Sequence, residues 1–294
     1  MAHRPLDSLW IALQLLRFRL VLALQGFWAA LLERLLPAPD MGNQPLRASA
    51  FIASLNTRTA LRLSLGSLAR RGPRPPLPLW IADNASSDGS VPFLEAYAAR
   101  RPHVELLLHP EIRWHGAWID DALARAPGDL LFVLDSDLVF FGSSLIPRCI
   151  AYMRRHPECL ILQADPWSPG RSSTAADTPL REPSLSTWFL CIRTSLRQQS
   201  RESFIAVFPE QQPQRQGRPL MSDTGAKVIA DLQRQGLANA VQVLPRHWRP
   251  LFHHIGSLSW LKWAGDPDNR WIRFKRAQLR LLDRLGSELL PDLP

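Results

Sequence analysis

The feature that most constrains this chain is an apolar run that ends in two acidic residues and then becomes apolar again. Residues 130–134 read Leu-Leu-Phe-Val-Leu, and Asp135-Ser136-Asp137 follows directly. Carboxylates at the end of a buried strand are costly to desolvate unless a partner compensates their charge. Ligands bind at the carboxyl ends of strands in open α/β sheets, so a divalent cation is a natural partner. Oxygen ligands favour Mg²⁺ or Mn²⁺ over zinc. The alternative is a solvated Asp-Ser-Asp turn.

The composition is that of a basic globular protein. The chain has 294 residues, a net charge of +9 and 46% hydrophobic residues, which allows a large core and argues against disorder. Arginine supplies nearly all of the positive charge. A basic surface favours anionic partners such as phosphates, nucleoside diphosphates, acidic lipids or nucleic acid. Cys149, Cys159 and Cys191 show no zinc-binding spacing and predict reduced, structural thiols in a cytoplasmic protein.

Segments with strand and helix patterns alternate between residues 48 and 134. Strands are expected at 48–55, 79–82, 104–108 and 130–134. Helices are expected at 57–71, 88–101 and 114–126. This alternation predicts an α/β fold with a largely parallel sheet and helices on its faces.

The N-terminal segment is apolar but interrupted by charge. Residues 9–36 are rich in Leu and Trp, yet two arginines interrupt them, and the longest uncharged run, 20–32, is short for a membrane span. No signal-peptide cleavage pattern follows. Two interpretations remain: a helix packed on the domain, or a helix in the membrane interface anchored by Trp10 and Trp28. A turn-rich linker is expected at 37–43.

The C-terminal segment predicts a basic amphipathic helix. Its apolar face comprises Trp271, Phe274, Leu281, Leu282, Leu285 and Leu289. The opposite face carries Arg273, Arg276, Arg280 and Arg284. The pattern is typical of a helix on an anionic membrane surface, and also of a helix docked on the domain with a solvated arginine face. We expect peripheral association with the inner face of the membrane.

Polar residues also follow two other expected strands. The stretch 56–58 ends the first strand, and the stretch 83–90 lies between the second strand and a helix. The carboxylate of Asp83 can accept hydrogens of a nucleobase, and Arg58 can pair with phosphate. The same residue types also form ordinary N-caps and Asx-turns. The chain contains neither a G-x-G-x-x-G fingerprint nor a P-loop.

The chain resembles a family-2 glycosyltransferase in the order and spacing of four motifs, which are 54–58, 81–90, 115–116 and 134–137. The resemblance covers roughly residues 50–141. It implies the A-type glycosyltransferase fold, which is a Rossmann-like, mixed but mostly parallel sheet that binds a nucleotide sugar.

The resemblance also implies roles for individual residues. It implies that Asp83 reads the nucleobase and that Asn56 and Arg58 lie near the nucleotide. It further implies that Asp135 and Asp137 hold the ribose, the sugar and a Mn²⁺ or Mg²⁺ ion on the diphosphate. Other donor-binding positions expected in these motifs are Asn84, His115, Gly116 and Ser136.

The second half is expected to supply the acceptor side. Asp223 opens an expected helix and resembles the carboxylate that acts as general base in the family, for which it must reach the acceptor hydroxyl. An ordinary N-cap is the alternative, and Asp165 and Glu182 are rival bases. The usual pair of acidic residues is absent, because Ser222 stands before Asp223.

His254-Ile255-Gly256 resembles the late His-x-Gly element of related transferases. The resemblance implies that His254 completes the metal site or touches the diphosphate. The alternative for His254 is a histidine packed in the core, and the alternative for His115 is a surface histidine at a helix start.

We therefore expect an inverting, metal-dependent glycosyltransferase. It would move a sugar from a nucleoside-diphosphate sugar to a hydroxyl of a glycan or lipid-linked acceptor in cell-surface polysaccharide synthesis. The alternatives are a non-catalytic membrane scaffold, a nucleotidyltransferase and a basic nucleic-acid-binding protein, although no nucleic-acid-binding motif is present. The expected parts are an N-terminal segment with linker (1–44), a transferase domain with donor and acceptor halves (45–142 and 143–255) and a C-terminal extension (256–294).

Overall fold

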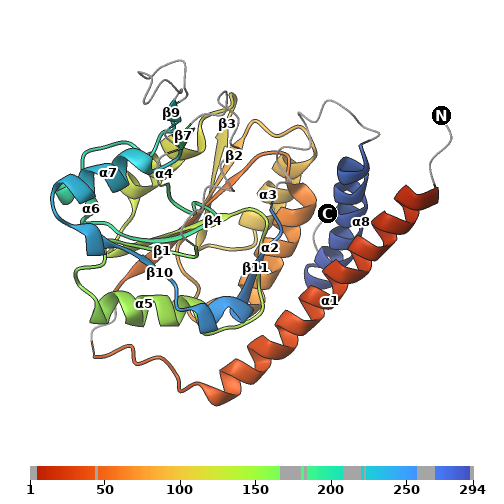
Figure 1. Cartoon of the computed structure of the whole chain (residues 1–294), viewed down its shortest axis with the longest axis horizontal. Helices are drawn as coiled ribbons and strands as arrows, with labels where there is room; N and C mark the ends of the chain where they lie inside the picture. Colours follow the sequence, from red (N-terminus) through yellow and green to blue (C-terminus); the bar gives the residue numbers. More distant parts are fainter. Residues whose placement is uncertain are drawn as a thin grey trace.

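A seven-stranded sheet forms the centre of the computed structural model (Figure 1). The structure describes residues 5–43, 46–165, 180–181, 184–207, 220–221, 223–256 and 269–291. In chain order the strands of the sheet are β1 (Ala48–Ser54), β2 (Leu79–Asn84), β3 (Val104–His109), β4 (Leu130–Asp135), β6 (Ile161–Gln163), β8 (Phe189–Arg193) and β10 (Val241–Val243).

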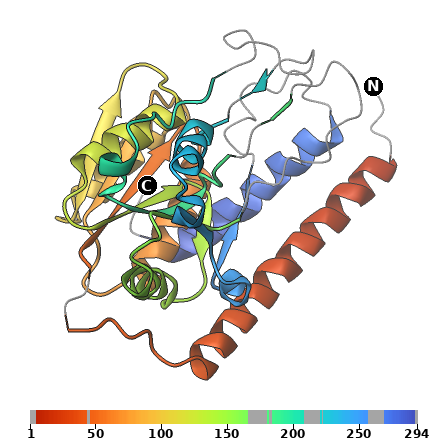
Figure 2. The same cartoon turned by 60° about the vertical axis from the view of Figure 1, so that its left-hand side comes forward.

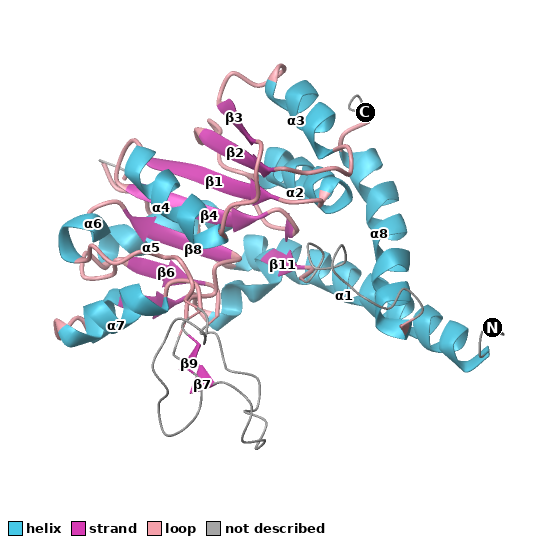
Figure 3. Cartoon of the chain, turned by 90° about the horizontal axis from the view of Figure 1, so that it is seen from above, coloured by secondary structure: helices cyan, strands magenta, loops and turns pink. Residues whose placement is uncertain are grey.

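The sheet is mixed but mostly parallel. Its spatial order is β10-β6-β8-β4-β1-β2-β3, and Figure 3 shows these strands stacked side by side. Strand β8 pairs antiparallel with both β4 and β6, whereas the other neighbours pair parallel. The predicted α/β architecture is therefore confirmed.

Helices cover both faces of the sheet. Three of them, α2 (Arg58–Arg71), α3 (Ser90–Ala98) and α5 (Leu145–Arg155), contribute to one core. Three others, α4 (His115–Arg125), α6 (Leu196–Gln199) and α7 (Ala226–Arg234), contribute to the second. Side chains alternate along each strand, so the β4 residues Leu130, Phe132 and Leu134 enter the first core while Leu131 and Val133 enter the second.

Two short sheets complete the described part of the chain. Strand β5 (Leu138–Phe140) pairs antiparallel with β11 (Phe252–His254), and β7 (Leu180–Arg181) pairs parallel with β9 (Leu220–Met221). The 3-10 helices η2 (Ala238–Ala240) and η3 (Arg246–Leu251) precede β10 and β11. The register of β11 places His254 opposite Leu138, directly after the acidic pair.

The N-terminal helix α1 (Pro5–Leu35) lies along the outside of the domain (Figure 2). One face packs on η3, β11 and the C-terminal helix, and it buries Phe18 and Ala29. The segment 7–35 is long and apolar enough to cross a membrane, a test that core helices and signal sequences also pass. The continuous helix is thus longer than the uncharged run suggests. Of the two expected anchors, Trp28 is half exposed, whereas Trp10 packs edge-on against Phe274.

The C-terminal helix α8 (Arg270–Leu289) packs mainly on α2. Its buried positions are Ile272, Lys275, Gln278, Leu282 and Gly286. The expected apolar face is therefore wrong in part, since Trp271 is 41% exposed. The two helices approach each other closely, since a Cβ on Gly66 would lie only 2.9 Å from the Cβ of Leu289. The domain boundaries expected at residues 44 and 255 stay a prediction.

The three cysteines are free and buried in the core. Burial raises the pKa of the Cys159 thiol to about 12, so this thiol is protonated and unreactive at neutral pH. This environment agrees with the structural role expected for the cysteines.

Candidate metal and donor site

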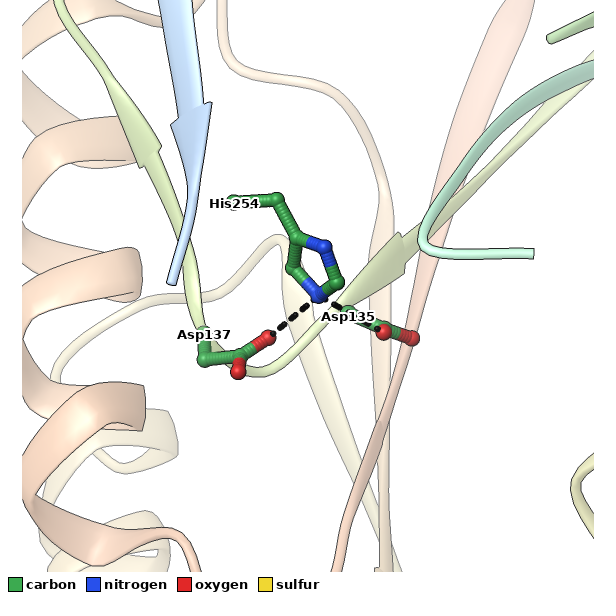
Figure 4. A group of neighbouring side chains, drawn as sticks. All are labelled: Asp135, Asp137 and His254. Carbon is green, nitrogen blue, oxygen red and sulfur yellow. Dashed lines mark ion pairs between the residues drawn. The ribbon is translucent and has the colours of Figure 1, made fainter. Parts of the chain in front are cut away.

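Asp135, Asp137 and His254 converge at the carboxyl end of β4 (Figure 4). The Nε2 atom of His254 lies 3.4 Å from Asp135 Oδ2 and 3.2 Å from Asp137 Oδ1. Their ligand atoms all lie within 4.8 Å of one another. The pairing of β11 with β5 produces this arrangement, and the backbone N–H of Ile255 donates to the carbonyl of Asp137 at 3.2 Å. The structure thus brings the three expected metal ligands together.

The three groups compensate one another electrostatically. Burial alone would lower the pKa of His254, but hydrogen bonds to Asp135 and Asp137 outweigh burial and raise it to about 9. Burial would raise the pKa of Asp135, but the hydrogen bond from His254 and the charges of His115 and His254 lower it. Two carboxylates this close need a positive charge beside them, and a bound cation would take over that role from the proton.

The donor set suits a divalent cation of the expected kind. Carboxylate oxygens suit Mn²⁺ and Mg²⁺, and an imidazole nitrogen suits Mn²⁺ better than Mg²⁺. Trp188 fixes the imidazole: its ring stacks on His254 with centroids 4.7 Å apart and planes 7° apart. The carbonyl of Trp188 also accepts from the backbone N–H of Asp135 at 3.0 Å. Sequence reasoning missed Trp188, whose only signal is its place directly before an apolar strand.

The loops after β1 and β2 are joined by hydrogen bonds. The N–H of Ser87 donates to Asn56 Oδ1 at 2.8 Å, and the N–H of Asn56 donates to Ser86 Oγ at 2.9 Å. The N–H of Arg58 donates to Asp88 Oδ2 at 2.9 Å. Asn56 adopts a left-handed conformation with φ of 52°, which asparagine tolerates better than most residues. These contacts hold Asn56 and Arg58 beside the loop that follows β2, close to Asp83.

Three buried polar atoms near these strand ends have no hydrogen-bond partner within the described ranges: Asn56 Nδ2, Asp83 Oδ2 and His115 Nε2. Asp83 is 1% exposed, and its other oxygen accepts from the N–H of Ser86 at 2.9 Å. Unpaired buried polar atoms are costly. A ligand that offers both N–H and C=O groups, as guanine and uracil do, would pair with a free acceptor and a free donor together.

Two other expected donor-binding residues have structural partners. Both amide atoms of Asn84 bond the backbone of Arg113, Nδ2 to the carbonyl at 2.8 Å and Oδ1 from the N–H at 2.6 Å. Ser136 Oγ accepts from Thr57 Oγ1 at 2.8 Å in a buried contact. Asn84 therefore holds the segment before α4, and Ser136 ties the end of β4 to the loop after β1. Their contact with a donor stays a prediction.

On the expected acceptor side, Asp223 lies in the turn before α7. The N-cap of α7 is Gly225, so Asp223 is not the N-cap that was the alternative for it. Its carboxylate accepts from the next N–H at 2.7 Å. The carbonyl of Phe204 accepts from the N–H of Gly225 at 3.0 Å and would lie 2.3 Å from a Cβ on Gly116. Phe204 thereby joins the starts of α7 and α4, next to His115, and Gly116 is required for this packing.

Of the two rival bases, Asp165 and Glu182, the structure describes only Asp165. Asp165 forms an ion pair with Arg249, which occupies its carboxylate. Glu182 and Ser222 lie outside the described residues. Asp223 stays the predicted base, and Glu182 stays a rival.

Comparison with known proteins assigns the chain to a family. The sequence profile of glycosyl transferase family 2 matches residues 49–203, which is more than half of the chain. The chain therefore belongs to glycosyltransferase family 2, and the predicted family and enzyme class are confirmed. The match includes β1, β2 and the acidic pair, and it ends before Asp223 and His254.

Curated relatives match only a part of this chain. The uncharacterized proteins Rv1520 of Mycobacterium tuberculosis and Mb1547 of Mycobacterium bovis are 29% identical over 110 residues, which is 37% of this chain. The chain spans about a third of the length of these relatives, 32%.

Solved structures with a similar fold include the mannosyltransferase PcManGT from Pyrobaculum calidifontis in complex with GDP-Man and Mn²⁺. It is 15% identical, with 97% of this chain and 86% of that chain covered and a TM-score of 0.49. TarS of S. aureus in complex with UDP-GlcNAc is also 15% identical, with 83% and 70% covered and a TM-score of 0.49.

Proposed function

We propose that this protein is an inverting glycosyltransferase that uses Mn²⁺ or Mg²⁺ and a nucleoside-diphosphate sugar. The observation that carries the proposal is the convergence of Asp135, Asp137 and His254 from distant parts of the chain. Two acidic residues alone would fit a solvated turn. An imidazole within 3.4 Å of both, aligned by a stacked indole, is typical of a preorganised metal site.

The donor is held by residues at three strand ends. Asp135 and Asp137 would bind the cation through carboxylate oxygens, and His254 through Nε2. When bound, the cation offsets the charge that develops on the leaving nucleoside diphosphate. Asp83 Oδ2 accepts an N–H of the base, and Arg58 pairs with a phosphate oxygen.

The acceptor side performs the proton transfer. Asp223 takes the proton from the acceptor hydroxyl while the oxygen attacks the anomeric carbon. Attack comes from the face opposite the diphosphate, so the configuration at that carbon inverts. The position of Asp223 before α7, joined through Phe204 to the start of α4, supports this assignment.

We further propose that the enzyme acts at the cytoplasmic face of the membrane. Its acceptor would be a glycan or a lipid-linked sugar in cell-surface polysaccharide synthesis. Exposed apolar residues form one stripe on α1, namely Leu9, Leu13, Leu16, Leu20, Leu24 and Phe27. Because the opposite face of α1 packs on η3 and β11, an orientation in the plane of the interface suits this helix.

A thermal-shift panel of nucleoside diphosphates, with and without Mn²⁺, tests the proposed donor site. Ligand at 100 times its dissociation constant stabilises a protein by about 2.7 kcal/mol, which corresponds to about 5–10 °C for a domain of this size. We expect one base to give this shift, and only with the metal. The proposal fails if no nucleotide stabilises the protein in a metal-dependent way, and a shift with a plain oligonucleotide instead would favour nucleic-acid binding.

A further inference from the structure

A groove with a volume of about 940 Å³ lies between α1, α2 and α8. The helices α1 and α8 meet near their N-terminal ends, where the rings of Trp10 and Phe274 are 5.9 Å apart and Arg273 pairs with Asp7 at 3.7 Å. From there the helices diverge, as Figure 2 and Figure 3 show, because α8 follows α2 while α1 continues along β11 and η3. The groove is the space between the two diverging helices.

The interior of the groove is apolar. Its walls and floor include Leu22, Ala23, Leu63, Phe141, Leu281 and Leu285. A groove of this volume and lining suits a hydrocarbon chain, because burial of the chain against these side chains removes apolar surface from water.

The same groove is lined by several arginines. Arg70 donates to the carbonyls of Glu288 and Leu289 at 3.0 and 3.2 Å, at the end of α8. The other arginines, which have no hydrogen-bond or ion-pair partner in the described part of the chain, are Arg19, Arg34, Arg71 and Arg284.

Two carboxylates also line the groove. Glu33 accepts from the N–H of Ser144 at 2.7 Å and from Ser143 Oγ at 3.0 Å, and Glu288 is exposed. The lining therefore has a net positive charge above apolar walls, which is the complement of an anionic head group on a hydrocarbon chain.

The groove is continuous with the exposed apolar stripe of α1. Ala23 and Ala30 line the groove and are themselves exposed. At 100° per residue they lie on the helix beside Leu20 and Phe27, which are 54% and 62% exposed. An α1 helix that rests on a bilayer would thus place the mouth of the groove at the lipid surface.

We propose that this groove binds an anionic phospholipid of the membrane. Its acyl chain would lie between α1 and α8, and its phosphate would contact Arg71 of α2 and Arg284 of α8. This site is separate from the donor site and goes beyond the proposed transfer reaction. Its test uses neither metal nor nucleotide sugar, so lipid binding and sugar transfer can fail independently.

Calorimetric titration of the full chain with monomeric dodecyl phosphate tests the site. Inorganic phosphate and dodecyl maltoside serve as head-group-only and neutral-chain probes. We expect dodecyl phosphate to bind at least about tenfold more tightly than either probe, because only it offers both the chain and the charge. Equal binding of inorganic phosphate would overturn the proposal, since the groove would then contribute nothing.

Variants distinguish binding in the groove from binding to the exposed apolar stripe of α1. Ala23→Phe combined with Ala30→Phe fills the groove but keeps α1 apolar, so dodecyl phosphate binding should be lost. Arg71→Gln combined with Arg284→Gln should weaken it about tenfold, whereas Arg246→Gln, at an exposed position of η3, should leave it unchanged. Undiminished binding to the filled variant, at an unchanged melting temperature, would overturn the site.

Vesicles and assembly state complete the test. The parent chain should float with vesicles of equal parts phosphatidylcholine and phosphatidylglycerol better than with phosphatidylcholine alone, and the arginine variant should lose this preference. A concentration-dependent dimer that the filled variant abolishes, without lipid binding by the parent, would assign the groove to a second copy of the chain and contradict the proposal.

Discussion

The carboxyl end of β4, with Asp135, Asp137 and His254, lies at one edge of the sheet. This sheet edge and the surface between α1 and α8 both concentrate charge, but they hold it differently. At the sheet edge the charged groups are short side chains that lie within 4.8 Å of one another, and Asp137 is only 6% exposed. Strand pairing, a stacked indole and backbone hydrogen bonds fix them. Between α1 and α8 the charges are exposed arginines above apolar walls.

This difference indicates what each region binds. A site whose atoms are fixed before the ligand arrives suits a ligand of defined geometry, because little conformational entropy is lost on binding. Long arginine side chains adapt to a phosphate whose position varies, while their methylene groups cover apolar surface. Small substitutions should therefore cause large losses at the sheet edge and graded losses between the helices.

The largest effect is expected for Asp137→Asn. It removes one charge from a buried residue that we propose as a metal ligand and keeps the side-chain shape, so metal-dependent donor turnover should fall roughly 10³-fold. Asp283→Asn, on the exposed side of α8, is the matched control and should retain parental turnover. Steady-state hydrolysis and transfer assays over a Mn²⁺ series check the result. Undiminished metal-dependent turnover in Asp137→Asn would refute the metal role.

Asp223→Asn should lower the turnover number by about 10²-fold or more, because general-base catalysis contributes about 10²–10⁴-fold. The proposed function assigns nucleotide binding to other residues, so the metal-dependent thermal shift with nucleotide should remain parental. This combination distinguishes a base from a donor-binding residue. Loss of nucleotide binding in Asp223→Asn, or unchanged transfer, would remove the assignment.

Local sequence order predicts the sheet edge well. Each strand from 48 to 135 and each polar stretch behind it could be placed, because apolar periodicity and turn residues act over a few positions. The position of His254 followed only from the family resemblance, since the pairing of β11 with β5 joins residues far apart in the chain. Trp188 could not be found, because its stacking on His254 exists only in the folded chain.

The buried face of α8 was predicted wrongly in part, for a related reason. Lys275 and Gln278 are polar, so a pattern of apolar residues leaves them out of the predicted face, yet both are buried. Lys275 Nζ donates to the carbonyls of Ile255 and Gly256 at 3.3 and 2.8 Å. A lysine that satisfies backbone carbonyls of another segment is buried by tertiary contacts, and sequence periodicity does not register them.

The affinity for Mn²⁺ should rise with pH. In the metal-free protein the pKa of His254 is about 9, above its ordinary value of 6.5, so the imidazole is protonated at neutral pH. Metal binding at Nε2 must displace this proton, and the affinity should therefore increase about tenfold per pH unit between roughly pH 7 and 8 and level off above about pH 9. Titration of Mn²⁺ followed by electron paramagnetic resonance measures this slope.

His254→Asn provides the control for this slope, because its side chain carries no proton to displace. Its Mn²⁺ affinity should be lower and almost independent of pH in the same range. The raised pKa has a second consequence in the metal-free protein. The stability that it contributes is fully present below about pH 6.5 and is lost as the pH rises through about 9. A flat affinity profile in the parent would show that His254 is not a ligand.

The smallest effect is expected at Lys275, through which α8 contacts the segment that follows His254. Lys275→Met keeps the volume but leaves the carbonyls of Ile255 and Gly256 unpaired, so the segment that follows His254 loses its support. Mn²⁺ affinity should fall by up to about tenfold, as for other residues that orient metal ligands, with turnover at saturating Mn²⁺ close to parental. Lys227→Met, at an exposed site on α7, should change neither. A lower melting temperature with unchanged Mn²⁺ affinity would contradict this prediction. Lys275 would then stabilise the fold without affecting the metal site, and the outer helices and the sheet edge would act independently.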